Sequence, residues 1–146
     1  MEEQAALFGA EESGGLTVSG HCPARDAVLA ALLIAEIWAL HGGALGEVYK
    51  KAAKRFGAPH SHRIDVNLSH EQKTALMAKM KSAPPSVLAG LQVSEVLVQG
   101  GVKLNFEDGG WMMLRVSGTE PLVRVYMEAP STKGLKQLRK AAQVLV

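Results

Sequence analysis

The chain has 146 residues, of which 47% are hydrophobic and 21% charged, and this composition favours a folded protein over a disordered one. The formal net charge of +2 gives no reason to expect a nucleic acid or a membrane as partner. The single cysteine, Cys22, cannot form an internal disulfide, and the acidic first residues are unlike a signal peptide, so a cytoplasmic location is expected.

The first 43 residues contain the elements of only part of a domain. A turn at 11–15 precedes an expected strand at 16–18, and Asp26 is expected to cap an apolar helix over 27–40. That helix is too short to cross a bilayer. One strand and one such helix cannot bury each other's apolar surface. Residues 1–43 are therefore predicted to be the C-terminal remnant of an α/β domain.

The rest of the chain predicts a helical linker over 44–59 and a complete α+β domain over 60–146. The elements expected in this domain are a strand over 61–68, a helix capped by Ser69 and running to about Met80, strands over 93–98, 102–106, 111–116 and 122–128, and a helix from about Thr132. Short glycine turns between successive strands favour antiparallel pairing, and two helices can cover one face of the resulting sheet.

The segment 115–124, Arg-Val-Ser-Gly-Thr-Glu-Pro-Leu-Val-Arg, has the residue types that bind a phosphate group. Arginine offers planar paired donors, serine and threonine offer hydroxyls, and glycine lets the backbone approach closely. A hairpin would bring the two arginines to the same edge. The candidate phosphate ligands are Arg115, Ser117, Gly118, Thr119 and Arg124. The alternative is an ordinary polar turn in which Arg115 pairs with Glu120.

This segment, followed by Val-Tyr, resembles the phosphate-binding loop of the α-D-phosphohexomutase family, which includes the phosphoglucomutases and phosphomannomutases. The family usually has proline in place of Val116. An earlier motif, Gly-Ala-Glu-Glu-Ser-Gly-Gly at 9–15, is similar to the family's sugar-binding loop, and the match assigns sugar hydroxyls to Glu11 and Ser13. In the family the sugar loop lies in the third of four domains and the phosphate loop in the fourth, which is their order here.

The resemblance implies that the chain is the C-terminal fragment of an intramolecular phosphotransferase (an isomerase). Such an enzyme interconverts hexose 1-phosphate and hexose 6-phosphate through a bisphosphorylated sugar. The chain would bind the sugar and the phosphate that is not transferred, its partners being hexose phosphate and the remaining domains. Residues 60–146 would have the TATA-binding-protein-like fold of the family's fourth domain. Because phosphoglucosamine mutases usually have glutamine at the position of Glu12, glucose or mannose phosphate is favoured, with the choice between these two open.

The family's catalytic and metal-binding motifs have no match in this sequence. The family transfers phosphate through a phosphoserine in a Ser-His-Asn-Pro-like loop, whereas the Ser-His pairs at 61–62 and 69–70 continue with Arg and Glu. Its magnesium site uses an Asp-x-Asp-x-Asp motif, but the aspartates here are isolated: Asp26, Asp65 and Asp108. We therefore expect no catalytic residue and no metal ligand in this chain, which alone would be inactive. The full-length enzyme would use Mg²⁺ and a glucose 1,6-bisphosphate-type activator.

Other interpretations of the sequence are weaker. The α+β domain could be a non-catalytic module that binds phosphosugars or nucleic acid, or simply a structural cap. No pair of aromatic residues on an exposed strand suggests base stacking, which argues against single-stranded nucleic acid. His60 and His62 would point to one face of a strand, but no third zinc ligand follows. Basic stretches near residue 50 and in the last helix are typical of solvated helix faces.

Overall fold

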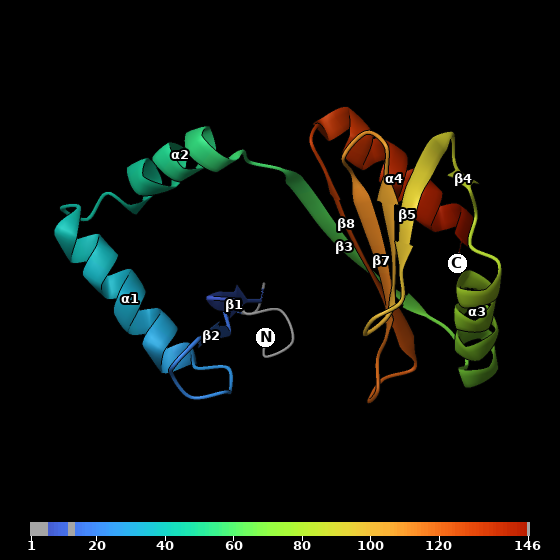
Figure 1. Ribbon diagram of the computed structural model, residues 1–146, viewed down its shortest axis with the longest axis horizontal. Coiled ribbons are helices and arrows are strands. Elements are labelled where there is room, and N and C mark those ends of the chain that lie inside the picture. Colours follow the sequence, from blue (N-terminus) through green and yellow to red (C-terminus); the bar gives the residue numbers. More distant parts are fainter. Residues whose placement is uncertain (1–5, 12–13, 146) are drawn as a thin grey trace. The chain divides into compact units, whose positions relative to one another are not determined.

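The computed structural model describes residues 6–11 and 14–145, and the chain divides into two compact units, with the boundary between Gly57 and Ala58. The first unit holds β1 (Phe8–Ala10), β2 (Leu16–Val18), α1 (Ala27–Leu40) and α2 (Leu45–Phe56) (Figure 1). The strands β1 and β2 pair antiparallel as a short hairpin. The sequence predicted β2 but not β1, which has only three residues. The assignment of a separate linker over 44–59 stays a prediction.

The helix α1 forms where the apolar run predicted it. The Asp26 carboxylate accepts a hydrogen bond from the Leu29 backbone N–H at 2.8 Å and so caps the helix. No residue of α1 is buried, and its exposed large hydrophobic side chains range from Leu33 at 37% to Leu40 at 74% exposed. Within the described residues, no single helix is long and apolar enough to cross a membrane. Only α1 and α2 taken together have the necessary length and composition, and the two helices are bent by 99° at the break between them. The hairpin and α1 thus do not bury each other.

The second unit has an α+β fold with an antiparallel sheet, as predicted. Its elements are β3 (His60–Asn67), α3 (His70–Ser82), β4 (Val87–Leu88), β5 (Leu91–Leu97), β6 (Val102–Phe106), β7 (Trp111–Val116), β8 (Leu122–Ala129) and α4 (Thr132–Leu145). In residues 58–145, all of which are described, the strand order is β3-β8-β7-β6-β5-β4. Only the two-residue strand β4 lacks a counterpart among the expected elements, because it is too short to carry a pattern.

Strict alternation of side chains places the core on one face of this sheet. The buried residues of the central strands are every second residue: Val102, Leu104, Phe106, Met112, Leu114, Val123, Val125, Met127 and Ala129. The two helices cover that face (Figure 1), with Met80 from α3 and Leu138, Ala141 and Ala142 from α4 in the same cluster. The residues between the buried ones, which include Arg115 and Arg124, consequently point to the opposite face of the sheet.

The helix α3 begins with a capping box, as the sequence indicated. The Ser69 hydroxyl accepts a hydrogen bond from the Gln72 backbone N–H, and the Gln72 side chain accepts one from the Ser69 backbone N–H. The helix ends at Ser82, two residues later than expected, just before the proline pair at 84–85. This cap fixes the residue at which α3 begins.

Candidate functional site

The two candidate arginines face each other across neighbouring strands. Arg115 in β7 and Arg124 in β8 are directly opposed in the antiparallel register. Like charges in such cross-strand pairs repel each other, and a bound anion would remove that repulsion. Arg115 is exposed and makes no ion pair within the described residues, whereas the Arg124 side chain is 33% exposed and contacts Glu120. The hairpin thus brings both guanidinium groups to one edge, as the sequence predicted.

The loop between these strands contains its own carboxylate. The Glu120 carboxylate pairs with Arg124, so the alternative in which it pairs with Arg115 is wrong. Its Oε2 also lies 3.4 Å from the Ser117 hydroxyl, which accepts a hydrogen bond from the Glu120 backbone N–H at 3.2 Å. Asp65 lies opposite Arg124 on the neighbouring strand β3, but it pairs with Arg63 at 3.1 Å. A side-chain carboxylate therefore lies against two of the candidate phosphate ligands.

The remaining loop residues leave room for a ligand. Gly118 and Thr119 are exposed, and a Cβ added at Gly118 would meet nothing within 4 Å. Ser117 is only 7% exposed, and its backbone N–H donates to the Leu122 carbonyl, which closes the turn. The Arg124 Nε–H is buried without a hydrogen-bond partner among the described residues. Since an unpaired buried donor is costly, this N–H favours a ligand oxygen beside it.

A lysine on α3 donates a hydrogen bond to the loop between β7 and β8. The Lys73 ammonium group, on α3, donates a hydrogen bond to the Glu120 carbonyl oxygen at 3.1 Å. The sequence analysis did not identify this contact, because 47 residues separate the two partners and no local pattern connects them. The position of the candidate loop therefore depends on α3 as well as on its own hairpin.

The candidate sugar-binding loop connects β1 to β2. Glu11 lies at its start, where its backbone N–H donates to the Gly15 carbonyl and its own carbonyl accepts from Gly14. The Glu11 carboxylate accepts a hydrogen bond from the Arg25 guanidinium at 2.9 Å. Ser13, the other predicted sugar ligand, lies outside the described residues, as does Glu12. The sequence did not predict this pairing, because Arg25 and Glu11 are 14 residues apart and no local pattern connects them.

A second polar pair follows the sugar loop. His21 Nε2 lies 2.9 Å from a carboxylate oxygen of Asp26, the residue that caps α1. The hydrogen bond with His21, together with that from the Leu29 backbone N–H, holds the pKa of Asp26 below its ordinary value. Each carboxylate oxygen of Asp26 thus makes a local contact, and these contacts connect the segment after the loop to the start of the helix.

The acidic residues do not make a metal site in the part of the chain that the structure describes. No group of three or more His, Cys, Asp or Glu side chains there is arranged to hold an ion. Asp26 caps α1 and Asp65 pairs with Arg63. Asp108 accepts a hydrogen bond from the Gly110 backbone N–H. These residues do not fit the carboxylate set that a magnesium ion requires.

Both units match known family models. Residues 64–143 match the phosphoglucomutase/phosphomannomutase C-terminal domain, and residues 1–56 match alpha/beta/alpha domain III of the same family. A phosphoglucomutase of Komagataeibacter xylinus is 32% identical over 93% of this chain and 27% of its own length. A probable phosphoglucosamine mutase of Methanothermobacter thermautotrophicus is 26% identical over 96% of this chain and 30% of its own length. The chain thus spans less than a third of these relatives.

A solved structure agrees with this assignment at the level of the fold. A phosphoglucomutase/phosphomannomutase family protein from Burkholderia thailandensis matches 99% of this chain and 28% of its own, with a TM-score of 0.68 and 20% identity. The family-model match over residues 64–143 alone covers more than half of the sequence, and it includes the hairpin that carries both arginines. The chain therefore belongs to the phosphoglucomutase/phosphomannomutase family.

Proposed function

We propose that this chain forms the substrate-binding portion of a phosphohexomutase, which interconverts hexose 1-phosphate and hexose 6-phosphate through a bisphosphorylated sugar. The observation that carries the proposal is the opposed pair Arg115 and Arg124, joined by a turn whose Gly118 leaves open space. Two guanidinium groups at one edge supply paired planar donors of the kind that phosphate oxygens accept. The turn adds the Thr119 and Ser117 hydroxyls.

The phosphate held here would be the one that is not being transferred. Its binding fixes the distance and orientation of the far end of the sugar, so that binding energy is available at the reacting end. A dianion placed between Arg115 and Arg124 would offset their mutual repulsion and satisfy the buried Arg124 Nε–H. Because the carboxylate of Glu120 lies against Arg124 without the ligand, phosphate would displace it.

The sugar ring would be held by the loop between β1 and β2, at Glu11 and Ser13. A carboxylate can accept hydrogen bonds from two neighbouring hydroxyls in either orientation of the sugar. The Arg25 guanidinium orients the Glu11 carboxylate through the 2.9 Å hydrogen bond, which supports a fixed geometry at this position. Arg25 is therefore a positioning residue for sugar binding in this proposal.

The substrate proposed is a hexose phosphate, with glucose or mannose phosphate favoured by Glu12. Relatives of this chain are named for glucose, mannose and glucosamine phosphates, so their names alone do not choose the sugar. Comparing glucose 6-phosphate, mannose 6-phosphate and glucosamine 6-phosphate as ligands would decide the preference. Tightest binding of the glucosamine ligand would contradict the choice based on Glu12.

Phosphate transfer itself would depend on residues that this chain does not supply. Its Ser-His pairs lack the family's phosphoserine motif, and its aspartates lack the family's magnesium motif. In the proposed full-length enzyme, the other domains would carry the phosphoserine and hold Mg²⁺, and a glucose 1,6-bisphosphate-type activator would keep the serine phosphorylated. The chain alone is accordingly expected to bind hexose phosphate without turning it over.

A titration of this chain with glucose 6-phosphate, followed by backbone-amide NMR, tests the proposal. We expect saturable shifts at Ser117, Gly118 and Thr119 that disappear in Arg115→Ala. The matched control is Arg139→Ala, which removes an equal charge from the exposed side of α4. Shifts that persist in Arg115→Ala would contradict the phosphate assignment.

Replacing Glu120 by glutamine is expected to tighten phosphate binding by roughly three- to tenfold. The substitution removes the anion that competes for Arg124, at an exposed ion pair worth about 1 kcal/mol or less, and it also removes repulsion toward the ligand. Calorimetric titration with inorganic phosphate measures the change, with Glu107→Gln as a control of equal charge elsewhere in the unit. If Glu120 served only to brace the loop, Glu120→Gln would weaken binding instead.

A further inference from the structure

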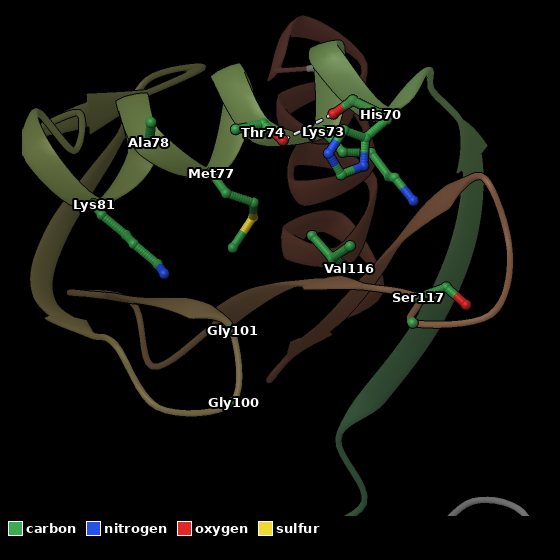
Figure 2. A pocket seen from close by; sticks show the side chains of 11 residues that line it. His70, Lys73, Thr74, Met77, Ala78, Lys81, Gly100, Gly101, Val116 and Ser117 are labelled. Atoms are coloured by element: carbon green, nitrogen blue, oxygen red, sulfur yellow. Dashed lines mark hydrogen bonds between the residues drawn. The ribbon is translucent and has the colours of Figure 1, made fainter.

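A cavity lies between α3 and the connections at the end of the sheet. It has a volume of about 740 Å³ and is bordered by α3, the Gly100–Gly101 turn and the beginning of the loop after β7. In Figure 2 the Met77 and Lys81 side chains extend from α3 toward that turn, and the Val116 side chain points back toward the helix. The turn packs closely against β7, since a Cβ at Gly101 would lie 2.4 Å from the Leu114 carbonyl oxygen.

This cavity is separate from the pair of arginines. Val116, which lines it, is the next residue after Arg115 in β7, and neighbouring residues of a strand point to opposite faces. The cavity is therefore on the face that the helices cover, and Arg115 and Arg124 are on the other face. The two regions share only the loop residues Ser117 and Gly118.

The cavity has cationic groups at both ends and an apolar middle. Lys73 and His70 lie toward the loop, and Lys81 lies near the Gly100–Gly101 turn. Neither lysine forms an ion pair within the described residues. The interval from 73 to 81 places the lysines about 12 Å apart along the helix, at 1.5 Å per residue. Met77 is halfway between them along the helix, and Val116, which lines the cavity from β7, is 38% exposed.

We infer that this cavity binds an elongated molecule with an anionic group at each end and an apolar middle. One anionic group pairs with Lys73, near His70, and the other pairs with Lys81. The middle of the molecule replaces water over Met77 and Val116, where burial of apolar surface contributes to affinity. Such a ligand contacts Ser117 and Gly118 from the side opposite the arginines. Its binding would therefore affect the loop that is proposed to hold phosphate.

The test uses the whole chain and suberate, a linear alkane dicarboxylate, as the probe. We expect saturable NMR shifts of the Met77 methyl group and of the Gly100 and Gly101 amides. Replacing Lys81 by glutamine should weaken suberate binding roughly tenfold, as expected for one charge-assisted hydrogen bond. Octanoate, a monocarboxylate of the same chain length, should bind more weakly than suberate by a similar factor.

The matched control is Lys79→Gln, which makes the same charge change on α3 at a position that does not line the cavity. Equal suberate affinity in Lys81→Gln and Lys79→Gln would overturn the inference, as would absence of a saturable Met77 shift. Arg115→Ala separates this site from the proposed function: it should abolish the response to glucose 6-phosphate and leave suberate binding unchanged. Loss of suberate binding in Arg115→Ala would place the anion at the arginines and refute a second site.

Discussion

Replacing Arg115 by alanine is expected to lower kcat/KM of the proposed full-length mutase by at least roughly 100-fold. A guanidinium group can donate two charge-assisted hydrogen bonds to one phosphate, each worth about 1.5–3 kcal/mol, and alanine removes both. The loss should be large because Arg115 is exposed and, within the described residues, makes no ion pair that would compete for it. Steady-state kinetics with glucose 1-phosphate measure the change.

Two further variants separate the charge of Arg115 from its shape. Arg115→Lys keeps the charge but loses the paired planar donors, so an intermediate rate is expected. Arg139→Ala removes a positive charge from α4 and should leave the rate near normal. Near-normal kinetics in Arg115→Ala would refute the role of this hairpin in substrate binding, and an equal loss in Arg139→Ala would point to a general effect of charge.

Replacing Leu104 by alanine is expected to lower the free energy of unfolding of the second unit by about 3 kcal/mol. Leu104 is 0% exposed in β6, and it is paired in register with Val96 on one side and Met112 on the other. Truncation removes buried apolar surface and leaves a cavity that strands paired on both sides cannot fully close. Urea unfolding, followed by the NMR signals of β6 and β7, measures the change.

The control for Leu104 is the same substitution at an exposed position. Leu97 in β5 is 43% exposed, so Leu97→Ala should cost less than about 1 kcal/mol. Similar unfolding midpoints for the two variants would mean that the face of the sheet bearing Leu104 is not the core. The phosphate response at Ser117 offers a second check, since Leu97→Ala should preserve it.

Regular, well-patterned elements were predictable from the sequence because burial imposes a period on them. Strands were expected over 102–106 and 122–128, and the structure has them at Val102–Phe106 and Leu122–Ala129, with every second residue buried. The strand β4 was missed because two residues show no period, and β1, of three residues, was missed as well. The helix α1 was predicted correctly, yet its apolar residues could not reveal whether anything within the chain would cover them.

The candidate site was predictable where it depends on strand register and not where it depends on distant side chains. A hairpin with arginines at both ends of one motif must bring them close, and Arg115 and Arg124 are indeed opposed. Whether Glu120 pairs with Arg124 or with Arg115 depends on side-chain conformations, which the spacing of residues in the sequence does not specify. In the structure Glu120 pairs with Arg124. The contact from Lys73 depends on how α3 packs against the sheet, which no local pattern records.

The alternation that separates the core from the arginines also limits how this hairpin can change during evolution. A single-residue insertion or deletion within β8 would reverse the direction of every side chain beyond it, bringing Arg124 to the position of Val123 or Val125. A charge would then enter the core at the same moment that a proposed phosphate ligand was lost. Substitutions can accumulate in β7 and β8 one at a time, whereas changes of length are confined to the connections between strands.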